Sequence, residues 1–412
     1  MEVLYECCGG LDVHAKTVVA CLIKQGKKQI RTFSTMTDEL LQLADWLTSE
    51  GCTHVAIEST GVYWKPVFNV LEGVLTVILV NARHIKAVPG RKTDVRDCEW
   101  LADLLRHGLL KASFIPPAEI RELRELTRYR QTLVTEHTAV ANRRQKLLES
   151  ANLKLGQVAS DVLGLSGRLM LRALAEGEAD AAKLAELAQG KLKSKKGELR
   201  RALEGRLTQA QRWVLAEFLA RLEELEAALS RVETRIGEEV AACPNLFVQE
   251  AVELLDSIPG VGERTAQTII AEIGVDMGRF PSAKHLASWA GVCPGNNESA
   301  GKRKSGQTTK GSKFLRTALV EAAWAATHTK GTYLRAKYQR LVKRMPKKKA
   351  LVAVAHTMLV IVYHLLSRRV AYAELGSDYV DRQHVERQRR RLVERLEGLG
   401  VKVTIEEVAE AA

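Results

Sequence analysis

The chain has 412 residues, 46% of them hydrophobic, and carries 62 Lys or Arg against 49 Asp or Glu, a formal net charge of +13. This length and apolar content exclude a disordered chain and predict two or three domains with substantial cores. The positive surplus favours a polyanionic partner such as a nucleic acid.

Cysteine usage and hydropathy point to an intracellular protein. The seven cysteines are odd in number and include no C-x-x-C pair, which predicts neither a zinc ribbon nor a secreted disulfide framework. The first six residues lack the basic region of a signal peptide. The longest apolar run, Ala350–Leu366, contains two histidines and a threonine, so we expect a buried helix rather than a membrane span.

The first hundred residues alternate strand and helix patterns. Short β-runs cover residues 3–13, 17–24 and 28–34, followed by helix 37–50, strand 55–57, helix 61–71, strand 75–80 and a helix that begins near Thr93. The predicted order is therefore β-β-β-α-β-α-β-α, an α/β domain of the RNase H or RuvC type.

Four carboxylates occupy informative places in that order. Asp12 lies in the first strand, Glu58 ends the fourth, and Asp94 and Asp97 are three residues apart and share a helix face. Hard divalent cations prefer such oxygen ligands, and one or two ions can assist in-line displacement at phosphorus. Any one of these acids alone is better explained as an ordinary surface charge, but four at one sheet edge predict a site for Mg²⁺ or Mn²⁺.

Two long amphipathic helices are predicted in the middle of the chain. The first carries an apolar stripe from Leu123 to Leu147 that is interrupted by Arg130, His137 and Arg144. The second carries an unbroken stripe from Leu215 to Ile236 with alternating spacings of three and four. This pattern favours either an antiparallel pair within the chain or a coiled coil between protomers. In either case His137 is a packing or register residue.

Two later segments favour contact with phosphates. Leu255–Gly262, followed by a helix over 265–273, resembles a helix-hairpin-helix in which Gly260 and Gly262 expose backbone N–H groups, although a purely packing hairpin is equally compatible. Between residues 302 and 349 there are fifteen Lys or Arg and one acid. A solvated basic face is the alternative, but flanking glycines favour nucleic-acid binding. The candidate contacts are Lys302, Arg303, Lys304, Lys310, Lys313 and Arg316.

Five segments together resemble a known family. They are GGLDVHAK, AIESTGVYW, PGRKTDVRDCEWLADLLRHGLL, LDSIPGVGERTAQTIIAEIG and SWAGVCPGNNESAGKRKSGQTTKGSKFLRTALVEAAW. In this order, and over nearly the whole chain, they are similar to the DEDD transposases of bacterial insertion sequences, a RuvC-like family that includes RNA-guided serine recombinases. The resemblance implies that Asp12, Glu58, Asp94 and Asp97 form the DEDD tetrad.

The same resemblance identifies Ser299 as the family's serine nucleophile. The family motif usually has paired serines before the glycine, whereas Ala300 follows Ser299 here, which supports Ser299, and Ser305 is a weaker candidate. The resemblance also implies donor and target DNA, a structured noncoding guide RNA, a homodimer or homotetramer without a membrane partner, and a cytoplasmic, nucleoid-associated protein.

These observations predict four regions. They are a RuvC/RNase H-like DEDD domain at 1–112, a helical coiled-coil region at 113–245, a mainly α transposase domain with the serine and the helix-hairpin-helix at 246–370, and a helical tail at 371–412. The expected function is DNA strand cleavage and transfer through a phosphoserine. A metal-dependent RuvC-like nuclease without a serine nucleophile and a non-enzymatic nucleic-acid scaffold are the alternatives.

Overall fold

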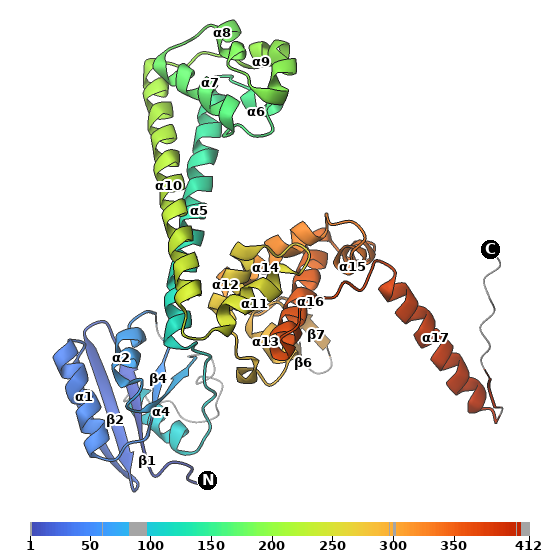
Figure 1. Ribbon diagram of the computed structural model, residues 1–412. Coiled ribbons are helices and arrows are strands. Elements are labelled where there is room, and N and C mark those ends of the chain that lie inside the picture. Colours follow the sequence, from blue (N-terminus) through green and yellow to red (C-terminus); the bar gives the residue numbers. More distant parts are fainter. Residues whose placement is uncertain are drawn as a thin grey trace. The chain divides into compact units, whose positions relative to one another are not determined.

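The computed structural model describes residues 2–59, 61–81, 97–295, 297–299, 302–400 and 402–404. Its contacts divide the chain into two compact units, residues 1–115 and 116–412. Among these residues, the first unit is an α/β domain and the second is helical apart from one small hairpin (Figure 1).

A five-stranded mixed sheet forms the first unit. Its strands are β1 (Cys7–Val13), β2 (Thr17–Lys24), β3 (Lys27–Ser34), β4 (His54–Glu58) and β5 (Thr76–Val80), in the order β3-β2-β1-β4-β5. The first three strands form an antiparallel meander, and β4 and β5 are added in parallel to β1. This mixed sheet fits the expected RNase H-like fold.

Helices cover both faces of this sheet. On one face, α1 (Thr37–Ser49) and α2 (Trp64–Leu71) bury a core with Leu11, Val55 and Ile57. On the other face lies α4 (Asp97–Arg106), whose leucines pack with Cys8, Ala56 and Val80. Strand residues therefore alternate between two apolar layers, as a sheet buried on both faces requires.

The sequence predicted these elements to within a few residues. The main difference is at the N-terminus, where the predicted first strand began at residue 3 but β1 begins at Cys7. The backbone N–H groups of Leu4 and Tyr5 instead donate to the carbonyl oxygen of Arg106, at 2.8 and 3.2 Å. The last carbonyl of α4 therefore accepts the hydrogen bonds that a neighbouring strand would accept if β1 were longer.

A pair of long helices begins the second unit. α5 (Ala118–Ser150) and α10 (Gln209–Ala242) run antiparallel side by side, and we call this pair the arm (Figure 1). Between them the chain forms a small group of helices, α6 (Leu155–Val158), α7 (Leu165–Glu176), α8 (Ala181–Glu186), η1 (Gly190–Lys195) and α9 (Lys196–Ala202), which we call the head. The head has its own core, shared with Leu148, Leu215 and Leu219 of the arm.

The polar residues that interrupt the stripe of α5 have different surroundings. Arg130 donates to the side chain of Gln267 at 2.8 Å and His137 contacts Glu226 of α10 at 3.2 Å. Arg144 is 5% exposed, and its Nε and Nη1 have no hydrogen-bond partner in the part of the chain that is described. The described residues therefore show α5 and α10 as an antiparallel pair within one chain, the first of the two predicted alternatives.

The rest of the second unit is a helical bundle with one β-hairpin. Its elements are α11 (Phe247–Asp256), α12 (Glu263–Ile273), η2 (Met277–Arg279), α13 (Ala283–Trp289), β6 (Asn297–Ser299), β7 (Lys302–Ser305), α14 (Lys313–Ala326), α15 (Tyr333–Val342), α16 (Lys347–Arg368) and α17 (Tyr379–Glu397). By length and composition, α16 could cross a membrane. However, it contacts α11, α13, α14 and α15, and its buried residues include Val354, Met358 and Val362. It is the central helix of this bundle.

Candidate active site

Asp12 and Glu58 lie on neighbouring parallel strands. The last paired residues of β1 and β4 are Leu11 and Ile57, so Asp12 and Glu58 are the next residues along their strands at the carboxyl edge of the sheet. Leu11 and Ile57 point into the core beneath α1 and α2. Because side chains alternate along a strand, Asp12 and Glu58 both point to the opposite face, which α4 covers.

Close packing fixes α4 on that face. A Cβ atom added to Gly10 would lie 2.2 Å from the carbonyl oxygen of Cys98 and 2.5 Å from the amide nitrogen of Ala102. Only a glycine allows this approach of strand and helix backbones. Since Gly10 is two residues before Asp12, and Cys98 follows Asp97, the contact brings the first turn of α4 to the same edge of the sheet.

Three of the four predicted carboxylates, Asp12, Glu58 and Asp97, therefore lie on elements that meet at this edge of the sheet. Asp94, together with Thr93, Arg91 and Lys92, lies outside the described residues. Among the residues that are described, no group of three or more His, Cys, Asp or Glu side chains is arranged closely enough to hold a metal ion. The donor set still suits a hard cation, because all of these side chains offer carboxylate oxygens.

His14 is a neighbour of this edge that the sequence analysis did not select. Its Nε2 atom lies 3.2 Å from a carboxylate oxygen of Asp12, and its side chain is 60% exposed against 27% for Asp12. The histidine follows Asp12 by two residues in the same strand direction, a spacing that places both side chains on one face. This spacing of two residues from Asp12 is the sequence feature that could have identified His14.

Ser299 lies at the end of β6, next to the turn of the small hairpin. In the antiparallel register it stands opposite Lys302, the first residue of β7. Below the hairpin, the N–H of Gly295 donates to the carbonyl of Gln307 at 2.9 Å, and Pro294 pairs with Thr308. Further down, a Cβ on Gly311 would lie 2.2 Å from the Ala290 carbonyl. The two legs of the Ser299 hairpin are thus held together over their length.

A buried ion pair anchors the base of this hairpin. Glu272 of α12 is 1% exposed and receives two hydrogen bonds from Arg128 of α5, at 2.7 and 3.0 Å. Its second oxygen also accepts from Ser312 Oγ at 2.8 Å, while that hydroxyl caps α14 by accepting from Leu315 N–H at 3.2 Å. The carboxylate therefore ties together the arm, α12 and the residue at which the hairpin enters α14.

A second arginine of the arm completes this arrangement. Arg124 donates to the last carbonyls of α12, those of Ala271 and Glu272, at 2.9 and 2.6 Å. A guanidinium at a helix C-terminus satisfies carbonyls that lack an intrahelical partner. Burial lowers the pKa of Arg124 to about 10, although the nearby Glu272 carboxylate acts in the opposite direction.

The predicted phosphate contacts have unequal surroundings. Lys310, Lys313 and Arg316 are exposed around the start of α14, whereas the side chains of Lys302, Arg303 and Lys304 lie outside the description. Gly260 has a positive φ of 86°, and a Cβ there would lie 2.4 Å from the Ala322 carbonyl of α14. This glycine therefore has a packing role. Gly262, at the start of α12, has no heavy atom within 4 Å of such a Cβ and is open to a ligand.

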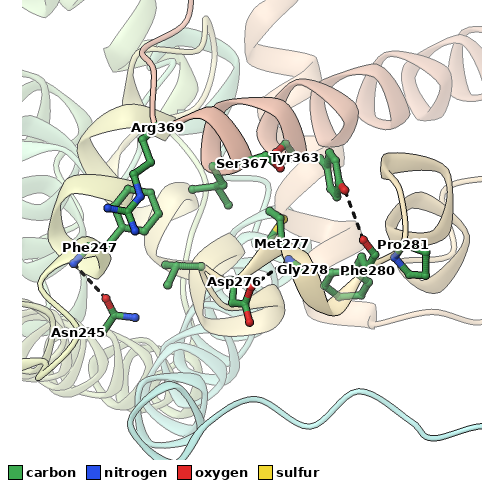
Figure 2. A pocket seen from close by; sticks show the side chains of 12 residues that line it. Asn245, Phe247, Asp276, Met277, Gly278, Phe280, Pro281, Tyr363, Ser367 and Arg369 are labelled. Atoms are coloured by element: carbon green, nitrogen blue, oxygen red, sulfur yellow. Dashed lines mark hydrogen bonds between the residues drawn. The ribbon is translucent and has the colours of Figure 1, made fainter.

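A pocket of about 580 Å³ lies elsewhere in the bundle, between the start of α11, the loop around Asp276 and the end of α16 (Figure 2). Arg369 covers the ring of Phe247 at 4.3 Å, and the Tyr363 hydroxyl donates to the Phe280 carbonyl at 3.3 Å. Of the residues that line this pocket, none is a predicted site residue. The predicted catalytic residues that the structure describes therefore lie at the carboxyl edge of the sheet and on the Ser299 hairpin, and not in this pocket.

Comparisons with known proteins match two parts of the chain to transposase families. A family model described as a transposase of the DEDD, IS110 type matches residues 9–153, and one described as a transposase of the IS116/IS110/IS902 family matches residues 252–339. The chain is 24% identical over 376 residues to a pilin gene-inverting protein of Moraxella bovis, covering 87% of this chain and 94% of that one. It is 27% identical over 301 residues to a putative transposase of Sinorhizobium fredii, covering 71% of this chain and 63% of the relative.

Proposed function

Because this chain belongs to the IS110 family of transposases and is an enzyme of DNA recombination, we propose that it cuts and joins DNA through a covalent phosphoserine at Ser299. The observation that carries the proposal is the carboxylate edge of the first unit. There, Asp12 and Glu58 share one face of adjacent strands, and α4, which begins at Asp97, packs on that face.

Transposases of the DEDD type use divalent metal ions, and we propose Mg²⁺ or Mn²⁺ bound by Asp12, Glu58, Asp94 and Asp97. Such an ion stabilises charge on the attacking and leaving oxygens of a phosphodiester. His14, beside Asp12, would orient that carboxylate through its 3.2 Å contact.

In the proposed step, Ser299 Oγ attacks the phosphorus of a DNA phosphodiester and forms the serine ester, while the bond to the 3′ oxygen breaks. The hydroxyl proton leaves the serine and the departing oxygen gains one, which gives a free 3′ hydroxyl. A serine hydroxyl is a weak nucleophile at its ordinary pKa, so it requires activation. In this proposal, the exposed cations at the start of α14, including Lys310 and Lys313, would bind the phosphate charge.

This division of labour requires the carboxylate edge and the Ser299 hairpin to meet on the same phosphodiester, within one chain or between protomers. By resemblance to the family, we also propose a homodimer or homotetramer, a structured guide RNA, and donor and target DNA as substrates. The four regions at 1–112, 113–245, 246–370 and 371–412 remain our proposed domains, and the cytoplasm beside the nucleoid is the proposed location.

The test of the serine mechanism is a trapped adduct. With an end-labelled donor DNA in Mg²⁺, together with the RNA that copurifies with the protein, the chain should form a protein–DNA adduct that survives denaturation. Ser299→Ala should lose the adduct and still bind DNA, and Ser305→Ala should keep both. Cleavage that continues in Ser299→Ala without an adduct would replace the serine mechanism with a RuvC-like nuclease that activates water.

A further inference from the structure

The head lies between the two parts of the chain that match the family. The matched ranges end at residue 153 and resume at residue 252, whereas α6–α9 occupy residues 155–202. The head nevertheless has an ordered core of its own, which includes Leu155, Met170, Leu184 and Leu199. A folded element at this place calls for a role of its own.

One edge of the head is strongly basic. Residues 190–201 contain six Lys or Arg and one acid, whereas residues 154–189 contain four Lys or Arg and five acids. The positive charge of the head is therefore concentrated in η1 and α9. The five side chains Lys191, Lys193, Lys195, Arg200 and Arg201 are all exposed, and we call them the basic edge.

The cations of the head fall into two groups. Lys154, Lys183, Lys196, Arg168 and Arg172 each lie within 4 Å of a glutamate. No residue of the basic edge has an ion pair within the described part of the chain. The paired cations hold the head together, while those of the basic edge remain available to an external polyanion.

The arm carries this edge away from the bundle that holds the Ser299 hairpin. α12 contacts α5 through Arg124, Arg128 and Arg130, and α5 continues to Ser150 before the head begins. From Arg130 to Ser150 the helix rises about 30 Å at 1.5 Å per residue. Along duplex DNA this distance corresponds to about nine base pairs, close to one helical turn.

We propose that the basic edge of the head is a second DNA-binding surface, which contacts the sugar-phosphate backbone of duplex DNA about one turn away from the DNA held by the transposase bundle. Lysines on a short, open helical segment suit this role, because backbone contacts require flexible positive charge and no base recognition. The surface would lengthen the bound DNA without adding sequence specificity. It acts before strand cleavage and does not depend on Ser299 being the nucleophile.

The experiment compares binding by full-length proteins in the Ser299→Ala background, so that no cleavage intervenes and the result is independent of the serine mechanism. The test variant is Lys191→Gln with Lys193→Gln and Lys195→Gln. Its matched control, Lys154→Gln with Arg172→Gln and Lys183→Gln, removes three charges from the same head. The control cations already have acid partners, so they differ from the test set in availability rather than in number.

Affinity is measured against salt concentration for duplexes of about 12 and about 40 base pairs, since only the longer one spans both surfaces. For the long duplex, the test variant should lower the slope of log affinity against log salt by about 3, at about 0.9 per lost phosphate contact. For the short duplex both variants should match the parent. A Lys-to-Arg version of the test variant should keep the full slope, which separates lost charge from misfolding.

Three results would overturn the proposal. An unchanged slope in the test variant would show that the edge is merely solvated. An equal loss of slope in the matched control would show that the effect comes from the net charge of the head and not from the basic edge. A loss confined to structured RNA, with duplex DNA still bound normally, would assign the surface to a different nucleic acid.

Discussion

Removal of the Glu272 carboxylate tests whether the ion pair at the base of the Ser299 hairpin stabilises the bundle. Glu272→Ala deletes the acceptor of two hydrogen bonds from Arg128 and one from Ser312. It also removes the carboxylate that lies 4.0 Å from the Nε of Arg124, whose side chain is 15% exposed. Breaking a buried pair by removing one partner costs about 3–5 kcal/mol, because the remaining charge stays buried.

How exposed Arg124 and Arg128 are decides where the loss of stability falls within this range of about 3–5 kcal/mol. Arg128 is 37% exposed and can regain water, which reduces its contribution. Arg124 keeps its bonds to the end of α12 in the variant. We therefore expect a loss of about 3 kcal/mol for Glu272→Ala, and about half of that for Glu272→Gln, which keeps an acceptor of the same shape.

The assay must report on this part of the chain, because a chain with two compact units does not guarantee two-state unfolding. Hydrogen exchange followed by mass spectrometry meets this need, with the opening free energy read from peptides that cover α12 and α14. The matched control is Glu238→Ala, whose pair with Arg235 joins side chains that are each 58% exposed. Such a surface pair contributes about 0.2–1 kcal/mol.

If peptides of α12 and α14 lose no more protection in Glu272→Ala than in Glu238→Ala, the ion pair does not stabilise the bundle. The reasoning from burial and bond geometry would then be wrong. A loss restricted to the arm, without an effect on α14, would equally contradict the link through Ser312, because that hydroxyl connects the carboxylate to the first turn of α14.

Three further predictions concern the catalytic parts. Asp12→Ala or Asp97→Ala should lower the rate of adduct formation by more than about 100-fold, because even residues that only orient a metal ligand typically contribute about 10–100-fold. A gel-shift assay should show unchanged DNA binding. Full activity of both variants would contradict the metal-site assignment. Neutralising residues 302–304 together should reduce the slope of log affinity against log salt concentration by about 3 in binding titrations. An unchanged slope would show that these residues are a solvated basic surface that does not bind nucleic acid. Gly10→Val should destabilise the first unit by more than about 3 kcal/mol in thermal unfolding, because the side chain would meet the α4 backbone, and a normal melting temperature would contradict the packing described for Gly10.

The sheet of the first unit could be predicted because its signals are local. Runs of β-branched and apolar residues marked each strand, and the change to a helical period marked α1. The chain order of the elements then left few topologies, since a parallel connection requires a crossover. The convergence of Asp12 and Glu58 followed from that topology. The sequence could not supply the strand register, in which Leu11 pairs with Ile57 and Asp12 and Glu58 are each the next residue.

The Glu272 network was beyond prediction for a different reason. Its members come from α5, α12 and the start of α14, so that Arg128 and Glu272 are separated by 144 residues. No local pattern distinguishes Glu272 from other glutamates on amphipathic helices. Only the packing of the three helices shows that this glutamate is buried, and burial is what makes its pairing with an arginine necessary.

The arm shows how tertiary pairing resolves an ambiguous heptad pattern. The stripe of α5 suited either an internal partner or another protomer, since apolar residues at heptad spacing carry no information about which chain lies opposite. One polar residue of the stripe does carry such information. His137 of α5 contacts Glu226 of α10 within the same chain, whereas Arg130 donates to Gln267 of α12. A shift of α5 along α10 by one turn would separate His137 from Glu226. The contact between His137 and Glu226 therefore helps to specify the register of the α5–α10 pair, from which the head and its basic edge extend.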